Sequence, residues 1–423
     1  MTAAAKTADA DGGDRVEGAD GGDGGCDAGT AAQARLRRAR FAVATVFCVH
    51  GAVTGSFATR IPWIQEHAGV SAGQLGFALA FPAVGGLLAM PTAGAVSHRF
   101  GEGTALRVLM VLWSLALILP SLAPNLVALC GGLFFYGAAA GVSAVVMNAL
   151  AVETERRLGR SIMSGLHGMW SIGVLIGSVG GTLAAHAGTD ARLHHGLAAA
   201  VLTVLGLIAC QGLRGMRSEP EEEAPPRFAL PPRSAVLIGA VGFCAVFAEG
   251  ASLDWSAVYL RDVLDASPGL AAATTTAFVL TMALARLAGD KVIDRFGAVR
   301  TVRGGGVLAT VGGLMVVTTP SVAVTMAGFG LIGLGVAVVV PVAYAAAARS
   351  GPAPARAIAG VATLSYVSGL IAPSAIGGIA DLTSLMVSFG LVTALAFGLV
   401  LGAGMLRAGD RTAGAGAGSA GER

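Results

Sequence analysis

Long apolar runs recur along the chain and are separated by short polar breaks. A helix needs about 20 mostly apolar residues to cross the hydrocarbon core of a bilayer, so each run predicts one membrane-spanning helix. The boundary between the ninth and tenth runs is marked only by Pro320 and Ser321, so eleven helices remain an alternative to twelve. The predicted helices are 41–60, 72–96, 104–122, 125–149, 161–185, 194–213, 234–256, 270–289, 301–319, 321–347, 357–380 and 384–406.

Composition supports an all-α membrane protein. Charged residues make up 13% of the chain and hydrophobic residues 54%, whereas a soluble domain carries about 25% charge. The net charge of +3 indicates no nucleic-acid partner. The five cysteines show no CxxC or metal-binding spacing, and no ATP-binding Walker A, GxSxG or HExxH motif is present. We therefore expect neither a metal nor a cofactor, and no enzymatic activity.

Polar segments divide the chain into two halves. Residues 214–233 contain five prolines and a run of glutamates, which is typical of an exposed cytoplasmic linker. This linker separates a predicted N-terminal six-helix bundle (39–213) from a C-terminal one (234–407). Residues 1–38 are predicted to be a disordered tail, because Gly, Ala and Asp predominate there. Residues 408–423 form a C-terminal tail.

The two halves resemble each other. HRFG at 98–101 and DRFG at 294–297 each follow an even-numbered helix, and the offset is 294 − 98 = 196. The same offset aligns four residues of the fifth helix with four of the eleventh. These pairs are Ile162 with Ile358, Gly173 with Gly369, Ser178 with Ser374, and Gly181 with Gly377. A duplicated six-helix unit is typical of transporters built from two bundles around a midplane cavity.

The distribution of Lys and Arg predicts the orientation. With a cytoplasmic N-terminus, the outside loops hold only Arg60, Arg192 and Arg261, and Arg286 lies within or at the end of a helix. The remaining 24 of the 28 basic residues (28 − 4 = 24) then lie inside. The positive-inside rule therefore places both termini in the cytoplasm of a multi-pass protein of the cytoplasmic membrane.

The twelve helices, the proline-rich central linker, the 6+6 repeat and the DRFG-type loops together resemble the major facilitator superfamily. Three stretches are similar to its MosC-like (rhizopine-transporter-like) branch. They are TRIPWIQEHAGVSAGQLGFAL (59–79), MNALAVETERRLGRSIMSGLHGMWSIG (147–173) and EGASLDWSAVYLRD (249–262). The resemblance implies two pseudo-symmetric six-helix bundles that rock about a central cavity in a monomeric transporter.

The resemblance also assigns gating loops. In the family, the acid of the loop caps a helix of the neighbouring repeat and the arginine pairs with nearby acids. An acid at a helix N-terminus gains about 0.3–1 kcal/mol, so such a contact can bias one conformation. The residues assigned in this way are Gly94, His98, Arg99 and Gly101 in the first copy, and Arg286, Asp290, Asp294, Arg295 and Gly297 in the second.

The first copy departs from the family pattern. His98 stands where the family has an acid, and Gly94 aligns with Asp290. A histidine cannot form the same anionic cap, so the latch on this side is weaker or depends on pH. The alternative for both loops is a tight cytoplasmic turn with solvated charges.

Two acids lie in the seventh apolar run. An ionised carboxylate at membrane depth is costly unless it is paired, protonated or in contact with water, so such residues mark ion or substrate paths. Glu249 is the first candidate for proton coupling or substrate binding; a protonated structural acid is the alternative. Asp254 lies about 140° further round the helix. Its neighbours Trp255, Tyr259 and Arg261 also suit an interfacial belt, so Asp254 is either at the cavity mouth or a boundary anchor.

Other polar side chains in the runs are candidate contacts for a proton or a solute. His50 and Thr54 share a face of the first helix, where the histidine either shuttles protons and binds solute or packs between helices. Asn148 and His167 lie near the inner ends of their helices, where local loop pairing is the alternative. Three aromatic side chains could stack on a solute or simply pack in the core. These are Trp170, Tyr344 and Tyr366.

Glycine spacing predicts close helix packing or hinging. Gly173, Gly177 and Gly181 form a small-xxx-small run, and Gly369 with Gly377 repeats it in the eleventh helix. The GSVGG stretch (177–181) lacks the proline of the motif that drug/proton antiporters of the superfamily carry.

These observations together predict a secondary active transporter. The expected cargo is a small polar organic solute, sugar- or polyol-like, moved by alternating access and coupled to protons through Glu249. The first alternative is proton-driven efflux of a metabolite or drug. An alternative of another class is a non-transporting membrane receptor or scaffold. The expected partners are the solute, protons and the lipid bilayer.

Overall fold

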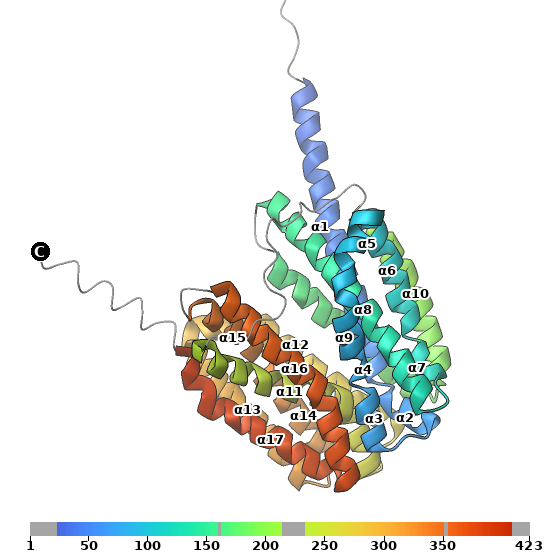
Figure 1. Cartoon of the computed structure of the whole chain (residues 1–423), viewed down its shortest axis with the longest axis vertical. Helices are drawn as coiled ribbons and strands as arrows, with labels where there is room; N and C mark the ends of the chain where they lie inside the picture. The colour runs from blue at the N-terminus through green and yellow to red at the C-terminus, as the bar shows by residue number, and fades with distance from the viewer. Residues whose placement is uncertain (1–22, 160–161, 214–232, 351–353, 408–423) are drawn as a thin grey trace, which may run out of the picture.

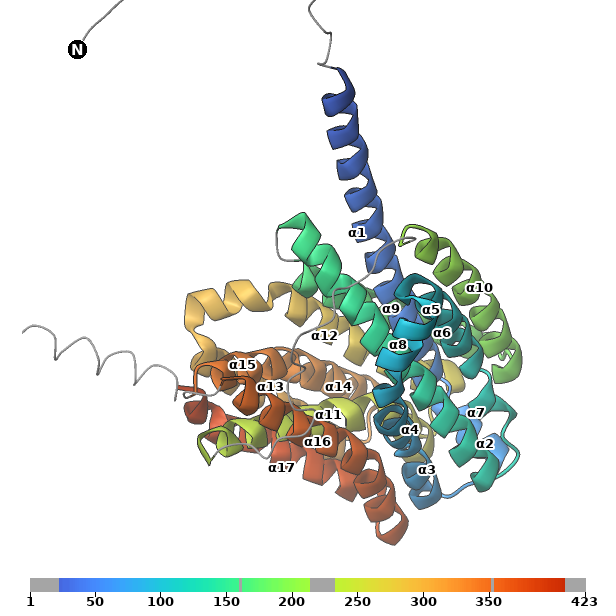
Figure 2. The same cartoon turned by 45° about the horizontal axis from the view of Figure 1, so that its top comes forward.

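The structure, a computed structural model, describes residues 23–159, 162–213, 233–350 and 354–407, which fold into helices without any strand. They form two bundles (Figures 1 and 2). The N-terminal bundle contains α1 (Asp23–Ala58), α2 (Ile61–Ala68), α3 (Ala72–Ala78), α4 (Phe81–Ala89), η1 (Met90–Thr92), α5 (Ala93–Phe100), α6 (Glu102–Ala116), α7 (Leu119–Leu122), α8 (Leu126–Leu158), α9 (Met163–His186) and α10 (Ala191–Gln211). The C-terminal bundle contains α11 (Arg233–Leu264), α12 (Pro268–Phe296), α13 (Ala298–Thr318), α14 (Val322–Val336), α15 (Val339–Ala348), α16 (Pro354–Leu382), α17 (Leu385–Gly402) and η2 (Ala403–Arg407).

Twelve helical segments in this part of the chain are long and apolar enough to cross a membrane, which confirms the predicted number. The break between the ninth and tenth spans falls at residues 319–321, so the alternative of eleven is excluded. Several spans are not one continuous α-helix. The second consists of α3, α4, η1 and α5, the third of α6 and α7, and the tenth of α14 and α15 with a break at Ala337 and Val338, while the twelfth ends in η2.

The first helix begins earlier than predicted. Residues 23–38 belong to α1, whereas composition placed them in a disordered tail. The stretch after residue 30 is rich in Ala, Gln and Arg, which favour helix, so the membrane helix continues outward through it. Residues 1–22, linker residues 214–232 and residues 408–423 lie outside the described residues.

The packing of the helices repeats between the bundles. Helix α1 packs on α9 as α11 packs on α16, and α4 packs on α8 as α12 packs on α14. Likewise α6 packs on α10, and α13 on α17. The sequence offset of 196 relates the members of these pairs, so the internal duplication is visible in three dimensions.

Glycines bring the backbones of α1 and α9 together. A Cβ atom added at Gly173 would lie 1.9 Å from the carbonyl oxygen of Cys48, and one at Gly177 would lie 2.1 Å from that of Ala52. Conversely, a Cβ atom at Gly51 would lie 2.1 Å from the carbonyl oxygen of Trp170. Small residues permit this approach of helices in a membrane. The predicted role of the run in close packing is confirmed at these positions.

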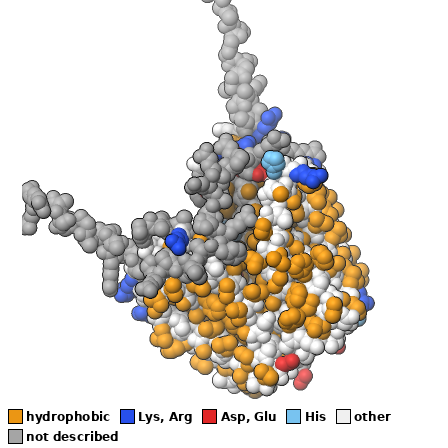
Figure 3. All heavy atoms as spheres, viewed as in Figure 1, with side chains coloured by type: hydrophobic (Ala, Val, Ile, Leu, Met, Phe, Trp, Pro, Cys, Tyr) orange, Lys and Arg blue, Asp and Glu red, His pale blue; other side chains and the backbone are white. Residues whose placement is uncertain are grey.

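The outer surface matches a bilayer. In the view of Figure 3, hydrophobic side chains cover the flanks of both bundles, and charged side chains gather at the two ends. Large apolar side chains such as Leu183 (64% exposed) and Leu287 (64% exposed) point outward. Such continuous exposed apolar surface is incompatible with water and fits lipid.

The bundles lie close together on one side of the molecule, and α9 and α12 pack along each other. We call the ends that carry Gly101 and Gly297 the terminal side, and the ends that carry Gly69 and Gly188 the far side. The bundles lie together near α2 and α3 on the far side and diverge toward α5 and α15 on the terminal side (Figures 1 and 2). Helix α16 packs on α3 and only touches α4, whereas α9 packs along α12.

The seam between α1 and α9 provides a test of packing. We expect Gly177→Ala to reduce the free energy of unfolding by about 1–3 kcal/mol, because the new methyl group would meet backbone atoms that cannot move away. Gly180→Ala in the same helix is the control, since a Cβ atom at Gly180 meets nothing within 4 Å. Thermal unfolding of the purified variants in detergent measures the difference. Equal melting temperatures would contradict the close contact.

Candidate functional site

An ion pair lies inside the C-terminal bundle. Glu249 projects from α11, and both of its carboxylate oxygens accept hydrogen bonds from Nη2 of Arg286 on α12, at 2.8 and 3.0 Å. The two side chains are 22% and 26% exposed, so neither is sealed in a dry interior. Pairing removes most of the cost of holding either charge at membrane depth.

The interrupted tenth span supports this pair. The carbonyl of Ala337, at the break between α14 and α15, accepts a hydrogen bond of 3.3 Å from Nε of Arg286. A carbonyl that leaves the regular helix pattern is available for such a contact, and broken helices commonly supply ligands in transporters. The guanidinium group therefore bridges a side chain and an unwound backbone segment.

Arg286, which the resemblance assigns to the gating motif, lies within α12 and not in the loop. It lies eleven residues before Gly297 (297 − 286 = 11), about 16 Å along the helix axis from the loop. Across the bundle interface, Arg286 acts electrostatically on His167 of α9. The imidazole of His167 also packs edge-on against Phe47, with ring centroids 5.6 Å apart. The structure thus brings Glu249, Arg286 and His167 into one region.

His50 occupies a different environment in the N-terminal bundle. Its Nε2 lies 3.2 Å from the hydroxyl of Ser143, and the indole Nε1 of Trp170 donates to its Nδ1 at 3.4 Å. The ring stacks on Trp113 at 4.9 Å. These contacts use both ring nitrogens of a buried, neutral imidazole, so the arrangement suits packing between helices and places Trp170 in the same cluster.

Asp254 lies within α11, which continues to Leu264, eight residues past the predicted end (264 − 256 = 8). Trp255 and Tyr259 are buried at 0% and 1% exposure, and the Tyr259 hydroxyl donates to the carbonyl of Val316 at 2.8 Å. These aromatics are core residues, which corrects their interpretation as an interfacial belt. The side chain of Asp254 is partly exposed and has no hydrogen bond or ion pair with any described residue.

The remaining candidates lie apart from the ion pair. Asn148 donates to the carbonyl of Ala144 in its own helix at 2.8 Å. Tyr344 is half-buried beside Ser365, whereas Tyr366 is 60% exposed. No set of three or more His, Cys, Asp and Glu residues within the described ranges could hold a metal ion.

Among the described residues, the gating loops form no side-chain hydrogen bond or ion pair between the bundles. Asp290, Asp294 and His98 are exposed and lack hydrogen bonds and ion pairs within the described part of the chain. Arg99 and Arg295 each lie over the phenylalanine that follows them, at 5.5 and 5.7 Å. In both copies a glycine with positive φ ends the helix, at 75° for Gly101 and 80° for Gly297, so the turn itself is duplicated.

Polar contacts join the bundles on the far side, and sequence reasoning missed them. Arg261 donates to the carbonyl of Pro62, and its Nη2 donates to Oε1 of Gln65 at 2.7 Å. The Ser71 hydroxyl donates to the carboxylate of Asp381 at 3.0 Å. We call these contacts the far-side latch. The sequence offers no signal for them, because the partners are separated by 196 to 310 positions.

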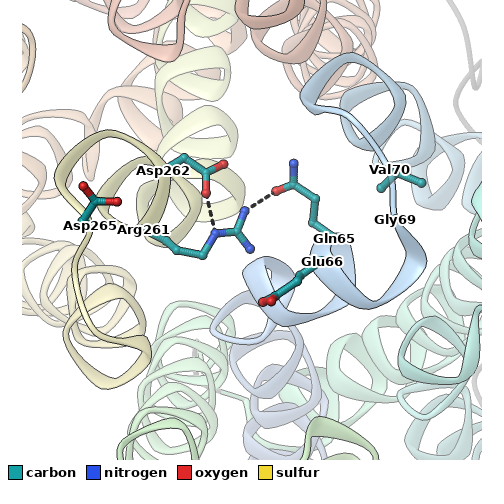
Figure 4. Close-up of a pocket in the computed structure, with 7 residues that line it drawn as sticks. All are labelled: Gln65, Glu66, Gly69, Val70, Arg261, Asp262 and Asp265. Carbon is teal, nitrogen blue, oxygen red and sulfur yellow. Dashed lines mark hydrogen bonds and ion pairs between the residues drawn. The ribbon is translucent and has the colours of Figure 1, made fainter.

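A pocket of about 540 Å³ adjoins the far-side latch (Figure 4). It lies where α2 faces the end of α11, and the guanidinium group of Arg261 extends between Asp262 and Gln65. Its other lining residues are Glu66, Gly69, Val70 and Asp265. The pocket lies at the far-side end of the seventh span, away from the Glu249–Arg286 pair.

Comparison with known proteins identifies a family and several relatives that are similar to this chain. The profile of the Major Facilitator Superfamily matches residues 43–250. An uncharacterized transporter of Sinorhizobium fredii is 31% identical over 83% of this chain and 93% of its own length. The membrane protein MosC of Rhizobium meliloti is 30% identical over 70% of this chain and 72% of its own.

Solved structures share the fold. A bacterial homolog of the human lysosomal transporter Spinster, in an inward-facing and unoccupied conformation, superimposes with a TM-score of 0.67 at 13% identity, covering 89% of this chain and 97% of that chain. A D-xylose–proton symporter superimposes with a TM-score of 0.63 at 14% identity, covering 86% of this chain and 97% of that chain.

The far-side latch predicts a shift in conformation on mutation. Arg261→Ala removes two hydrogen bonds from a cation, each contributing about 1.5–3 kcal/mol at most, so the far side should open more often. Double electron–electron resonance between spin labels at positions 66 and 382, which lie on different bundles, should give longer distances in Arg261→Ala than in the unsubstituted protein. Arg192→Ala is the control, because the described contacts of the Arg192 side chain, with Trp63, His67 and Ser121, all lie within its own bundle. An unchanged distance distribution in Arg261→Ala would refute the latch.

Proposed function

The chain belongs to the major facilitator superfamily, and from this premise we propose that it couples the movement of a small polar organic solute to protons through Glu249. The family establishes a transporter and not an enzyme. The observation that carries the finer proposal is the Glu249–Arg286 pair, an acid with a bound counter-charge inside a membrane helix.

Protonation of Glu249 would weaken its ion pair with Arg286, and this change could couple proton binding to solute binding. The neutral acid no longer holds the guanidinium group, which keeps its charge at any physiological pH. Arg286 would then retain only the carbonyl of Ala337 and would be free to bind an oxygen of the solute. Because Arg286 lies near the interface with α9, its release would change the charge at the boundary between the bundles.

The arrangement of the two bundles, together with the arginine distribution, favours one orientation of the protein in the membrane. We propose that the terminal side faces the cytoplasm, because the loops there and the first helix carry most of the arginines. The far side would then face outward, held closed by the far-side latch, and the molecule would be inward-facing. Both termini would be cytoplasmic in a monomer of the cytoplasmic membrane.

The solute class rests on the chemistry of the site. A guanidinium group, a carboxylate and an imidazole at the bundle interface suit a solute rich in hydroxyl groups. The fold is also that of a D-xylose–proton symporter, and this likeness supports the proposal of a sugar-like solute carried with protons. We therefore propose a sugar- or polyol-like solute.

Removal of the titratable group tests the coupling. In proteoliposomes, Glu249→Gln should abolish solute uptake driven by a pH gradient, because the amide neither binds nor releases a proton, while exchange at equal pH should persist. Glu66→Gln, at an exposed acid on the far side, is the control. Accumulation by Glu249→Gln equal to that of the wild type would reject Glu249 as the coupling group.

The ion pair also makes a prediction about stability. Arg286→Gln should destabilise the protein toward the lower end of about 3–5 kcal/mol, since it leaves Glu249 without a counter-charge in a partly exposed position. The double variant Glu249→Gln with Arg286→Gln should recover most of that loss, because no uncompensated charge remains. Melting temperatures of the three variants measure the coupling. Additive losses would show that the two side chains do not act as a pair.

A further inference from the structure

Helix α1 extends well beyond the rest of the N-terminal bundle on the terminal side (Figures 1 and 2). It begins at Asp23, although about 20 residues are enough to cross the hydrocarbon core of a bilayer. Counted back from the other end of the helix at Ala58, 20 residues reach Ala39 (58 − 39 + 1 = 20). The residues before Ala39 therefore lie at the depth of the lipid headgroups and beyond it.

A cluster of arginines occupies this part of α1, within less than two helical turns. Its members are Arg35, Arg37, Arg38 and Arg40. All four side chains are exposed, and none forms a hydrogen bond or an ion pair with a residue in the part of the chain that the structure describes. Four neighbouring cations repel one another, so a helix that carries them just outside the hydrocarbon core attracts anions.

Phe41 shows which side of α1 faces the lipid. Its side chain is 76% exposed, although it lies just inside the hydrocarbon boundary. Ala39 is 3% exposed and projects about 160° away from Phe41 around the helix axis. The bundle therefore covers the side of α1 that bears Ala39, and the side that bears Phe41 faces the acyl chains.

The arginines are distributed around the direction of Phe41. Arg37 precedes Phe41 by four residues (41 − 37 = 4), so it projects within about 40° of Phe41 and lies about 6 Å further out along the axis. Arg38 projects within about 60° of Phe41, and Arg40 and Arg35 flank this direction at about 100° and 120° on opposite sides. The lipid-facing side thus presents an aromatic ring to the acyl chains and guanidinium groups to the headgroups.

We propose that these four arginines, the α1 basic cluster, bind the phosphate groups of anionic phospholipids in the leaflet on the terminal side. A guanidinium group donates paired hydrogen bonds to phosphate oxygens, and its charge does not depend on pH. A zwitterionic choline headgroup carries its own cation, whereas an anionic headgroup leaves a net negative charge for the cluster. The ring of Phe41 packs against the acyl chains of the same lipids.

Bound lipid would act on the transporter because α1 is one continuous helix. The same helix carries His50 and Thr54 and packs backbone to backbone on α9 through Gly51. Anionic lipid at the α1 basic cluster therefore holds the N-terminal bundle in a fixed orientation relative to the membrane plane. This role is independent of the solute and of the group that couples protons.

Fluorescence of an indole at position 41 tests which lipid lies there. Full-length Phe41→Trp is reconstituted in phosphatidylcholine vesicles that contain a minor fraction of phosphatidylglycerol, and each lipid is brominated in turn, because bromine quenches nearby tryptophan. The unsubstituted protein supplies the signal of the four native tryptophans for subtraction. We expect phosphatidylglycerol to be enriched at least about threefold around position 41 relative to the bulk bilayer.

Matched charge variants locate the cause of the enrichment. Replacement of all four arginines of the α1 basic cluster by Gln, in Phe41→Trp, should return the lipid composition around position 41 to that of the bulk. The control replaces four exposed arginines at the terminal side of the C-terminal bundle by Gln, which removes the same net charge and should leave the enrichment in place. These are Arg300, Arg303, Arg349 and Arg356.

A salt titration keeps the test independent of the folding of the arginine variants. Screening by salt should lower the enrichment in Phe41→Trp itself. Equal quenching by the two brominated lipids, enrichment that resists salt, enrichment that survives loss of the cluster, or an equal loss in the control variant would each overturn the proposal. Equal quenching is the result expected if an acidic segment of the chain, such as residues 221–223, covers the arginines instead.

Discussion

The free-energy cost of placing a charge in the hydrocarbon of the bilayer determines how the functional residues of this molecule are arranged. An ionised side chain at the centre of a bilayer costs about 2.5–3.5 kcal/mol or more, so each one requires compensation. Glu249 and Arg286 compensate each other, and the break after α14 adds the carbonyl of Ala337. An ion pair between two side chains can break and re-form, so a proton or a solute can take the place of one partner. The broken helix, the ion pair and the unpaired Asp254 therefore all reflect the need to neutralise charge within the membrane.

Packing decides which parts of the molecule can move. Within the N-terminal bundle, α1 and α9 touch backbone to backbone through Gly51, Gly173 and Gly177, which leaves no room for adjustment. Between the bundles, Gly377 likewise allows the backbones of α16 and α3 to come close together. Here, however, a side-chain hydrogen bond from Ser71 to Asp381 adds to the contact. At this contact, close backbone approach and a few polar contacts can separate without loss of a large core. This distribution supports the proposal that rigid bundles move against each other.

Features set by local sequence could be predicted, and features set by distant partners could not. The positions of the twelve spans follow from hydropathy, and the repeat from a single offset, because both are properties of contiguous sequence. The candidate site was predicted only in part. Glu249 was recognised from its cost in the membrane, but its partner Arg286 was assigned to the loop of the motif it precedes. Trp255 and Tyr259 were wrongly predicted to lie at the membrane interface. Neighbouring helices bury them, and the sequence of their own helix does not reveal that burial.

The two ends of the molecule differ in what holds them, and this difference bears on the cycle. On the far side, Arg261 and Asp381 contact the opposite bundle, whereas the charged residues of the terminal loops are exposed. Of the two duplicated loops, only the one with Asp294 retains an acid that can cap a helix, because His98 replaces it in the other. If the loops cap helices as the family resemblance implies, closure of the terminal side would gain one anionic cap of about 0.3–1 kcal/mol and not two. Under the proposed mechanism, a small gain there against a few hydrogen bonds on the far side would keep the two states close enough in free energy for a solute or a proton to shift them.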